Sequence, residues 1–378
     1  MARPKVALVG VGSVGGTVAA ALHSADKCDL TLVARGESLA ALQADGLTVL
    51  QPWRGEGAAW NARVPCVDTA ATADIGPQDF IIVVTKAHHF PALLDSLLPM
   101  VGADTCVVPC MNGIPYWYNY FGAPADPGGA IAPVDPEGRL WSELGPERAM
   151  GCVVKTGGRM EAPGVTVASG GGTLEFGEPD GSDSARLAQL VSLFEPGGAI
   201  GAMEPRDRPV PFSVVARPVI REAVWDKLVF NVVQRGATWC NVLTTLTQST
   251  NGDAAADPQL RHIHSLVIDE VATICAGLNP PVKLRVTAEK CKCKCSCSLR
   301  VFFLNEAFLR CTDFAGMEGS DHKASTLQDL LAGRPFEKDA LVTAVQQVAH
   351  EAGVPTPYID FAGALLQGLE RNAVLARL

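Results

Sequence analysis

The segment Ala223–Val233, AVWDKLVFNVV, is apolar except for three polar side chains, Asp226, Lys227 and Asn231. Lys227 and Asn231 stand four residues apart, so on a helix they project from one face. Each carries a desolvation cost in such surroundings unless another group binds it. The pattern therefore indicates a face that meets a polar ligand.

A glycine-rich stretch near the N-terminus, GVGSVGG, supplies Gly10, Gly12 and Gly15 in G-x-G-x-x-G spacing. The match follows the first expected strand and opens the first expected helix. In that context the glycines permit a tight turn, the approach of a pyrophosphate to the backbone and close packing of helix on strand. We therefore predict dinucleotide binding; the alternative is a purely structural turn.

Three polar residues follow other expected strands. Arg35 ends the second strand, where an NAD site usually has Asp or Glu, and an arginine there suits a 2′-phosphate. This favours NADPH over NADH, against the alternative of an ordinary surface arginine. Lys86 and Asn112 follow two later strands, at the carboxyl ends where open α/β sheets bind ligands. Asn112 before Gly113 would also suit a simple turn.

The C-terminal part adds further candidates: Asn241, Asn251, Ser325 and Glu337. The alternative to a functional role for Ser325 is that of a helix N-cap, with Gln328 completing a capping box. The alternative for Glu337 is a solvated carboxylate at the start of a helix. The histidine pairs (His88 with His89, His262 with His264) lack metal-ligand spacing, and we predict no metal site.

The elements that must position these residues fall into two groups. Apolar strands alternate with helices in the first part, which predicts an α/β domain over residues 1–205 with a doubly wound, Rossmann-like parallel sheet. Within it we expect a helix over about Phe90–Met100 and a β-hairpin over Gly164–Pro179. Residues 206–219 indicate a linker or insertion. Residues 220–378 have helical periodicity, which predicts an all-helical domain; the resemblance described below implies that this domain binds the substrate and carries the catalytic lysine.

Composition excludes several classes of protein. The 378 residues are 48% apolar and 19% charged, enough for two folded domains, and the net charge of -9 argues against nucleic-acid binding. No apolar run is long enough to span a membrane. With no room for a targeting peptide before the first strand, we expect a soluble, cytoplasmic protein.

Eleven of the twelve cysteines fall into two sets. Seven occur singly in apolar contexts, which predicts reduced, buried thiols: Cys28, Cys66, Cys106, Cys110, Cys152, Cys240 and Cys275. The other four alternate with other residues: Cys291, Cys293, Cys295 and Cys297. Alternation is poor geometry for zinc. We predict an exposed insertion over residues 290–316.

Together these motifs resemble the ketopantoate reductase (2-dehydropantoate 2-reductase) family over almost the whole chain. The segments that carry the resemblance are GVGSVGG, VTKAH, MNGIPYWY, GCVV, GEPDGS, VWDKLVFN, HKASTLQDLLAGRPFE and AGVPTPYID. The resemblance implies NADPH-dependent reduction of 2-dehydropantoate (ketopantoate) to (R)-pantoate, on the route to pantothenate and coenzyme A. It also implies an active site in a cleft between the two domains.

The resemblance also implies a role for each candidate residue. Gly10, Gly12 and Gly15 correspond to the pyrophosphate loop and Arg35 to the 2′-phosphate contact, whereas Lys86 and Asn112 correspond to the cofactor–substrate junction. Lys227 corresponds to the proton donor, and Glu337 to a catalytic residue at the nicotinamide end of the cofactor. The substrate-binding positions are Asn112, Lys227, Asn231, Asn241, Asn251 and Ser325.

This role would explain the lysine in the apolar segment. Hydride delivered to a ketone carbon leaves an alkoxide that must be protonated, and a lysine beside the carbonyl can polarise it and then donate the proton. Partial desolvation would lower the pKa of Lys227 towards neutrality, which suits that task.

The chain departs from the family pattern at 206–219, at 234–239 between Asn231 and Asn241, and at 290–316. Six extra residues are not a whole number of helical turns, so a helix there must bulge or break. Two alternative functions therefore stay open: a related NADPH-dependent reductase of another 2-keto or β-keto compound, and a catalytically dead NADPH-binding protein. A homodimer is also left open.

Overall fold

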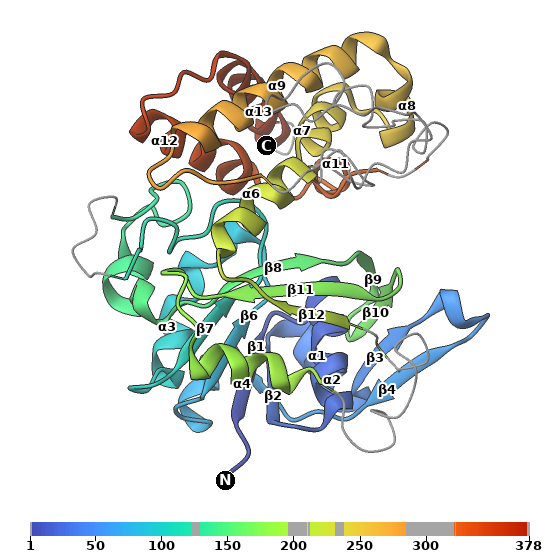
Figure 1. Ribbon diagram of the computed structural model, residues 1–378. Helices are drawn as coiled ribbons and strands as arrows, with labels where there is room; N and C mark the ends of the chain where they lie inside the picture. The colour runs from blue at the N-terminus through green and yellow to red at the C-terminus, as the bar shows by residue number, and fades with distance from the viewer. Residues whose placement is uncertain are drawn as a thin grey trace, which may run out of the picture. The chain divides into compact units, whose positions relative to one another are not determined.

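The computed structural model describes residues 2–122, 129–195, 210, 212–230, 238–284, 321 and 323–375. Within it the chain divides into two compact units, Met1–Ile220 and Arg221–Leu378. The first unit is an α/β structure and the second is helical (Figure 1). This confirms the predicted fold class.

The first unit is built around a sheet of five parallel strands in the order β5-β2-β1-β6-β7. The strands are β1 (Lys5–Val9), β2 (Asp29–Ala34), β5 (Cys66–Asp68), β6 (Phe80–Val83) and β7 (Cys106–Pro109). β6 and β7 are buried along their whole length, and β1 is buried after its first residue. Their continuous apolar runs reflect a parallel sheet covered on both faces.

Two smaller sheets complete this unit. One has the order β4-β3-β10-β9 and the other β12-β11-β8. Their strands are β3 (Leu47–Leu50), β4 (Ala59–Ala62), β8 (Gly151–Lys155), β9 (Gly158–Ala162), β10 (Val165–Ala168), β11 (Gly172–Gly177) and β12 (Phe212–Ala216).

The predicted hairpin over Gly164–Pro179 is wrong, because β10 and β11 belong to different sheets. β10 pairs antiparallel with the preceding β9 and parallel with β3, while β11 pairs with β8 and β12. The glycines between β10 and β11 resemble a hairpin turn. In the structure they carry the chain from one sheet into the next.

The segment predicted as a linker or insertion contains β12, which pairs parallel with β11. Glu175 on β11 is buried and accepts hydrogen bonds from Arg217 Nε at 2.7 Å and Lys155 Nζ at 2.6 Å. Burial alone would raise the pKa of Glu175, but the two cationic donors outweigh it and the pKa is lowered. Arg217 therefore neutralises a buried carboxylate of the sheet, and the prediction of a linker is corrected for residues 212–217.

The helices of the first unit are α1 (Ser13–Ala25), α2 (Gly36–Asp45), α3 (Leu94–Leu97) and α4 (Ala185–Leu193), with a π-helical turn at Leu140–Leu144. Short 3₁₀ turns lie at Pro52–Arg54, Thr69–Asp74, Ala87–His89, Pro91–Leu93, Leu98–Met100 and Pro146–Arg148. The helix expected over Phe90–Met100 is thus α3 between two such turns. A proline occupies the first or second position of each turn, which interrupts a longer helix.

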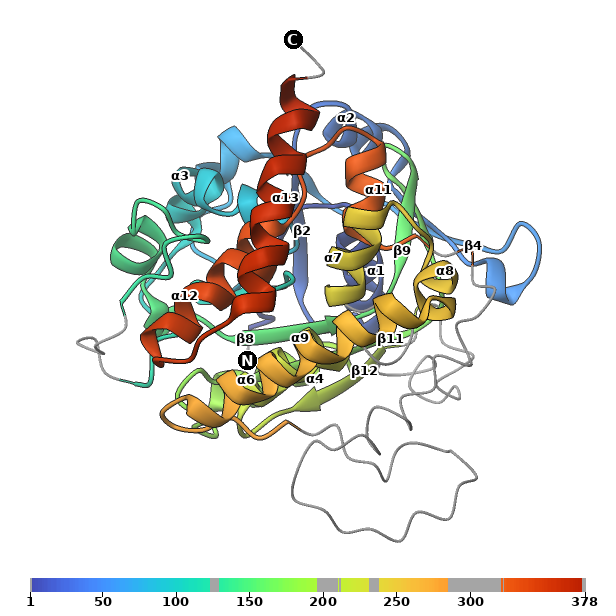
Figure 2. The same cartoon turned by 90° about the horizontal axis from the view of Figure 1, so that it is seen from above.

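The second unit is helical in the part of it that the structure describes (Figure 2). Its elements are α6 (Ile220–Phe230), α7 (Thr238–Thr247), α8 (Asn251–Ala256), α9 (Pro258–Gly277), α11 (Ser325–Leu331), a π-helical turn (Asp339–Thr343), α12 (Ala344–Glu351) and α13 (Pro357–Leu375). α7 lies against α8, α9, α11 and α13. Among the described residues, none of the helices has the length and hydropathy of a membrane span.

The structure describes the side chains of six of the seven scattered cysteines, and all six are thiols. Five are buried and Cys66 is half-buried. Burial raises the pKa of Cys28 and Cys66 to about 11 and that of Cys106 to about 12. Cys110 and Cys152 lie with their sulfurs 3.3 Å apart. The prediction of reduced thiols agrees with these six, with Cys66 less buried than expected.

Several predictions fall outside the described residues. These are the position of Asn231, residues 234–237 of the extra residues 234–239, and the insertion 290–316 with its four alternating cysteines. They stay predictions.

Candidate functional site

The glycine loop joins β1 to α1 and has a backbone that only glycine adopts readily. Gly10 has φ +96°, a value that L side chains rarely take. A Cβ on Gly15 would lie 1.9 Å from the carbonyl oxygen of Gly10, so α1 packs directly against the loop. A Cβ on Gly12, by contrast, would meet no described atom within 4 Å. Gly12 is the N-cap of α1, and its open side gives a negatively charged group access to the start of that helix.

The candidate residues of the first unit leave the parallel sheet at one edge. Val9, Val83 and Pro109 are in register on β1, β6 and β7. Gly12, Lys86 and Asn112 each stand three residues beyond those strand ends. The structure therefore brings the glycine loop, Lys86 and Asn112 to the carboxyl edge of the sheet, where ligands bind in open α/β folds. Lys86 and Asn112 are half-buried.

Arg35 follows β2 at the same edge. It is the N-cap of α2 in extended conformation, and its side chain is exposed. Val33 of β2 pairs with Val9 of β1, so Arg35, directly after β2, follows the strand adjacent to the one that leads into the glycine loop. The position fits a contact to a group carried by a ligand that lies across β1 and β2.

Thr85 is a residue of this edge that sequence reasoning missed. Its methyl carbon would lie 2.6 Å from a Cβ on Gly10, so the side chain packs over the glycine loop. Its hydroxyl oxygen is buried and has no hydrogen-bond partner among the described residues. The position of Thr85 beside Lys86, directly after an apolar strand, was the available signal. A buried hydroxyl and a glycine loop with an open side fit the phosphates of a dinucleotide.

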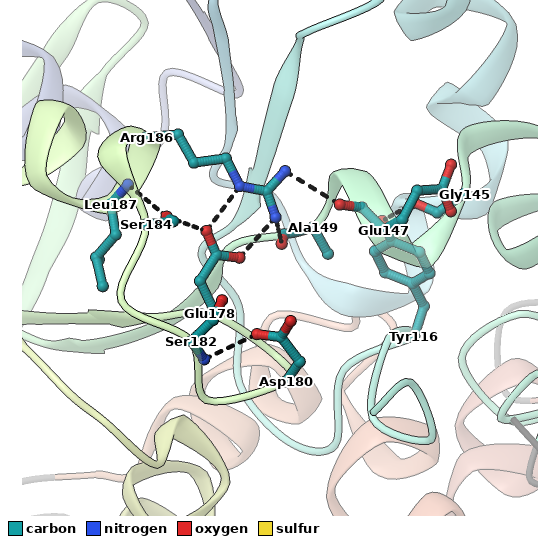
Figure 3. A network of polar contacts seen from close by, with 10 residues as sticks. All are labelled: Tyr116, Gly145, Glu147, Ala149, Glu178, Asp180, Ser182, Ser184, Arg186 and Leu187. Atoms are coloured by element: carbon teal, nitrogen blue, oxygen red, sulfur yellow. Dashed lines mark hydrogen bonds and ion pairs between the residues drawn. The ribbon is translucent and has the colours of Figure 1, made fainter. Parts of the chain in front are cut away.

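A polar network supports the loop that follows Asn112 (Figure 3). The hydroxyl of Tyr116 donates to the carbonyl oxygen of Gly145 at 3.2 Å. Arg186 donates to the carbonyl oxygens of Glu147 at 3.0 Å and Ala149 at 3.3 Å, in the same stretch of chain. Arg186 in turn binds the carboxylate of Glu178 through Nε at 2.7 Å and Nη2 at 2.6 Å. The network fixes the chain against which Tyr116 rests.

In the second unit, Lys227 lies near the end of α6 and is half-buried. Its neighbours Trp225, Asp226 and Leu228 are buried. Among the residues of α6 whose burial the structure describes, Lys227 and Glu222 are the two that are half-buried, and the others are buried. This is a setting in which an ammonium group is partly desolvated and can still meet a ligand.

Two asparagines lie on neighbouring helices of this unit. Asn241 is buried on α7, and Asn251 is the first residue of α8, only 1% exposed. Thr250 caps α8 through a capping box with Asp253. The cap fixes the start of α8 and therefore the position of Asn251. Because α7 and α8 pack together, the structure brings the two asparagines onto adjacent helices.

Ser325 and Glu337 lie at the two ends of the α11 region, and α11 packs against α7. Ser325 is exposed and is the first residue of α11; the N-cap is Ala324, so the alternative of a Ser325 N-cap is wrong. Gln328 donates to the carbonyl of Lys323 and forms no capping box. Glu337 is 4% exposed, which contradicts the alternative of a solvated carboxylate.

The turn that carries Glu337 is held from both sides. Before it, Arg334 donates to the buried carboxylate of Asp329 at 3.1 Å. After it, Lys338 is buried, and its ammonium lies 3.1 Å from Glu370 and donates to Gln367, both on α13. The neighbours of Glu337 are thus tied to α11 and to α13. The sequence did not indicate these contacts of Lys338, because Gln367 and Glu370 lie 29 and 32 residues further along the chain.

Comparison with known proteins agrees with this arrangement. The family description "Ketopantoate reductase PanE/ApbA" matches residues 6–181, and its C-terminal counterpart matches residues 219–370. The chain belongs to the ketopantoate reductase family. It is 33% identical over 366 residues to the 2-dehydropantoate 2-reductase of Mesorhizobium japonicum, covering 97% of each chain. Members of this family are oxidoreductases, and the prediction of an oxidoreductase is confirmed.

Solved structures give the same assignment. A structure described as a ketopantoate reductase of Ralstonia solanacearum MolK2 matches with a TM-score of 0.77 and 27% identity, covering 98% of this chain and 99% of the other. A D-mandelate dehydrogenase with NADH and anilino(oxo)acetate matches with a TM-score of 0.71, 19% identity and coverage of 98% and 99%. The second similarity concerns the fold alone.

Proposed function

We propose that this protein catalyses the NADPH-dependent reduction of 2-dehydropantoate to (R)-pantoate. The observation that carries the proposal is that Gly12, Lys86 and Asn112 each stand three residues beyond strand ends that are in register, at the carboxyl edge of the parallel sheet. This edge suits a dinucleotide, and its polar side chains suit a carboxylate and a carbonyl beside it. The identity to the Mesorhizobium japonicum enzyme supports the choice of substrate.

In this proposal each unit has its own task. The glycine loop and the start of α1 bind the pyrophosphate, and Arg35 binds the 2′-phosphate. Lys86 and Asn112 orient the reacting ends of cofactor and substrate. NADPH, when bound, supplies the hydride for the ketone carbon.

The second unit supplies the acid. Lys227 donates a hydrogen bond to the carbonyl oxygen and then transfers its proton to that oxygen as negative charge develops. Asn231, Asn241, Asn251 and Ser325 bind the carboxylate and hydroxyl groups of the substrate. Glu337, buried in its turn, meets the nicotinamide end of the cofactor. A small 2-keto acid is therefore the expected substrate class.

The experiment that tests this function follows the oxidation of NADPH by absorbance, with 2-dehydropantoate and a panel of other 2-keto and β-keto acids. We expect turnover with 2-dehydropantoate to exceed that with every other acid of the panel. Faster turnover of another acid would assign a related reductase. NADPH binding without turnover of any acid would assign a protein that binds cofactor and lacks catalysis.

A further inference from the structure

Two buried thiols of the first unit, those of Cys110 and Cys152, are in contact. The thiol of Cys110 donates a hydrogen bond to the sulfur of Cys152, and the two sulfurs lie 3.3 Å apart. Each residue is 5% exposed. A disulfide needs its sulfurs about 2.0 Å apart, so the two atoms would have to approach by only about 1.3 Å. The pair is therefore placed to form a covalent bond.

The backbone sets the two cysteines opposite each other. Val107 of β7 forms a parallel bridge with Ala149, and the amide of Met150 donates to the carbonyl oxygen of Val107 at 2.8 Å. Cys110 and Cys152 each stand three residues beyond this bridge. Neighbouring strands lie about 4.7–4.9 Å apart, within the Cα separation of about 4.4–6.8 Å that a disulfide spans. The bond therefore needs rotation of the side chains and little displacement of the backbone.

Strand pairing holds each cysteine from its other side. The amide of Cys110 donates to the carbonyl oxygen of Val83, the last residue of β6, at 2.8 Å. Cys152 lies on β8 and pairs with Phe176 of β11. The contact of the two sulfurs thus joins the five-stranded parallel sheet to the sheet of β8, β11 and β12. A disulfide there would tie the two sheets together.

The pair lies next to the chain that carries Asn112. Met111, which follows Cys110, is half-buried, and so is Asn112. The surface of the protein therefore begins one residue beyond the buried thiol, which gives a small oxidant a short path to it. In the proposed function, Asn112 orients the reacting ends of cofactor and substrate. A movement of Cys110 towards β8 is transmitted to Asn112 through a single residue.

We propose that Cys110 and Cys152 form a reversible disulfide that lowers turnover, with hydrogen peroxide as the oxidant. The peroxide oxidises one thiol to a sulfenic acid and is reduced, which releases one water. The second sulfur then attacks the sulfenic sulfur, so that the S–S bond forms and the S–O bond breaks. The hydroxyl leaves as a second water with the proton of the second thiol. A dithiol reductant restores both thiols by exchange.

The contact of the sulfurs explains why this pair, although buried, would be captured as a disulfide. A sulfenic acid formed on either residue meets the other thiol at once, before a second oxidation to the sulfinic acid. The effect on turnover rests on the proposed function, whereas formation of the bond does not. The two experiments below therefore test the bond and its effect separately.

The first experiment locates the bond in the full chain. The protein is treated with hydrogen peroxide, its remaining thiols are alkylated under denaturing conditions, and it is digested with trypsin. Cleavage after Arg148 and Lys155 releases residues 149–155, whose single cysteine is Cys152. We expect mass spectrometry to find this peptide joined to residues 87–139, which contain Cys110, and dithiothreitol to separate the two.

Matched variants assign the partner, because residues 87–139 also contain Cys106 on the same strand. Cys106→Ser should keep the joined peptides, and Cys110→Ser should lose them. Cys110→Ala is a second variant with the same expected loss, and thermal unfolding checks that each variant is folded. Absence of the joined peptides in the original protein, or their survival in Cys110→Ser, would overturn the assignment of this site.

The second experiment measures turnover of NADPH before peroxide, after peroxide and after dithiothreitol. We expect turnover to fall at least about fivefold on oxidation, because a small misplacement of an orienting group slows the reaction, and to recover on reduction. Cys110→Ser should keep its turnover through the same treatment, which separates the disulfide from oxidation of Met111. Unchanged turnover of the disulfide form would overturn its effect on the reaction. Absence of turnover before treatment would contradict the proposed function, and the peptide analysis would still decide whether the bond forms.

Discussion

The carbonyl oxygen of Gly10 lies only 1.9 Å from the place where a Cβ on Gly15 would stand. The start of α1 is therefore in direct contact with the end of β1, with no room for a side chain between them. Gly12, two residues beyond Gly10, has open space on its Cβ side. Gly15 thus allows close packing of α1 on the loop, and Gly12 leaves space beside the loop. Substitutions at the two positions should therefore have different effects.

Gly15→Ala should destabilise the first unit, because the methyl group forces α1 away from the loop; we expect a loss of about 1–3 kcal/mol. Gly12→Ala should unfold at nearly the temperature of the original protein and bind NADPH at least about tenfold more weakly, because its methyl group fills the side open to the pyrophosphate. Thermal unfolding without ligand and a fluorescence titration with NADPH measure the two effects. Unchanged NADPH affinity in Gly12→Ala would contradict the assignment of this loop.

Arg35→Ala should remove most of the preference for NADPH over NADH. The exposed side chain after β2 would otherwise donate charge-assisted hydrogen bonds to the 2′-phosphate, worth roughly 1.5–3 kcal/mol. NADH affinity should change little and serves as the internal control. Equal affinity of the original protein for the two cofactors would show that Arg35 has no such contact.

Lys227→Ala should lower kcat by about 10²–10⁴ and leave NADPH binding nearly unchanged, since it removes only the acid. Lys283→Ala, a change of a lysine outside the proposed site, is the matched control and should retain activity. Turnover of Lys227→Ala within about threefold of the original would mean that the proton comes from another group.

Lys338→Met should raise the KM for substrate or cofactor, or lower kcat. Its unfolding temperature should stay close to that of the original protein. The buried ammonium ties the turn of Glu337 to Glu370 and Gln367 on α13, and methionine keeps its volume without the charge. Lys338→Arg should recover much of the activity because it keeps the charge. Steady-state kinetics and thermal unfolding together separate positioning of Glu337 from a general loss of fold. If Lys338→Met has the same kcat and KM as the original protein, the ion pair of Lys338 has no part in the reaction.

The stability of the second unit should fall as pH decreases from about 6.5 to 4. Burial lowers the pKa of His264 on α9 to about 4, against an ordinary value near 6.5 in the unfolded chain. Between these values the unfolded state binds more protons, so acid favours unfolding, with a total effect of about 3 kcal/mol. The effect is absent above pH 6.5. Urea unfolding at several pH values measures it, and His264→Gln should reduce the slope.

Local features of the first unit were predictable from the sequence. The apolar strand, the three glycines and the following helix are contiguous, and the close approach of Gly15 to Gly10 lies within that stretch. Likewise, Lys86 and Asn112 follow apolar strands directly, so a parallel sheet places them at one edge regardless of strand order. The helical character of the second unit follows from its periodicity in the same way.

Features that depend on distant partners were decided by the tertiary structure. Alternation and glycines are local signals and predicted a hairpin of β10 with β11, but β10 pairs with β9 and β3, and β11 pairs with β8 and β12. The sequence predicted that Arg217 is part of a linker, but in the structure its side chain donates a hydrogen bond to the buried Glu175. Glu337 is buried and Ser325 is exposed, because packing between helices determines accessibility.

Helix α13 shows the same limit most clearly. Ile359 and Phe361 are equally apolar in the sequence, yet one is buried and the other is 67% exposed. Hydrophobicity alone marks both as core residues. Among the described residues, the packing of α7 and α9 against α13 determines which apolar side chains of that helix are buried, because burial is a property of the assembled neighbours and not of the residue.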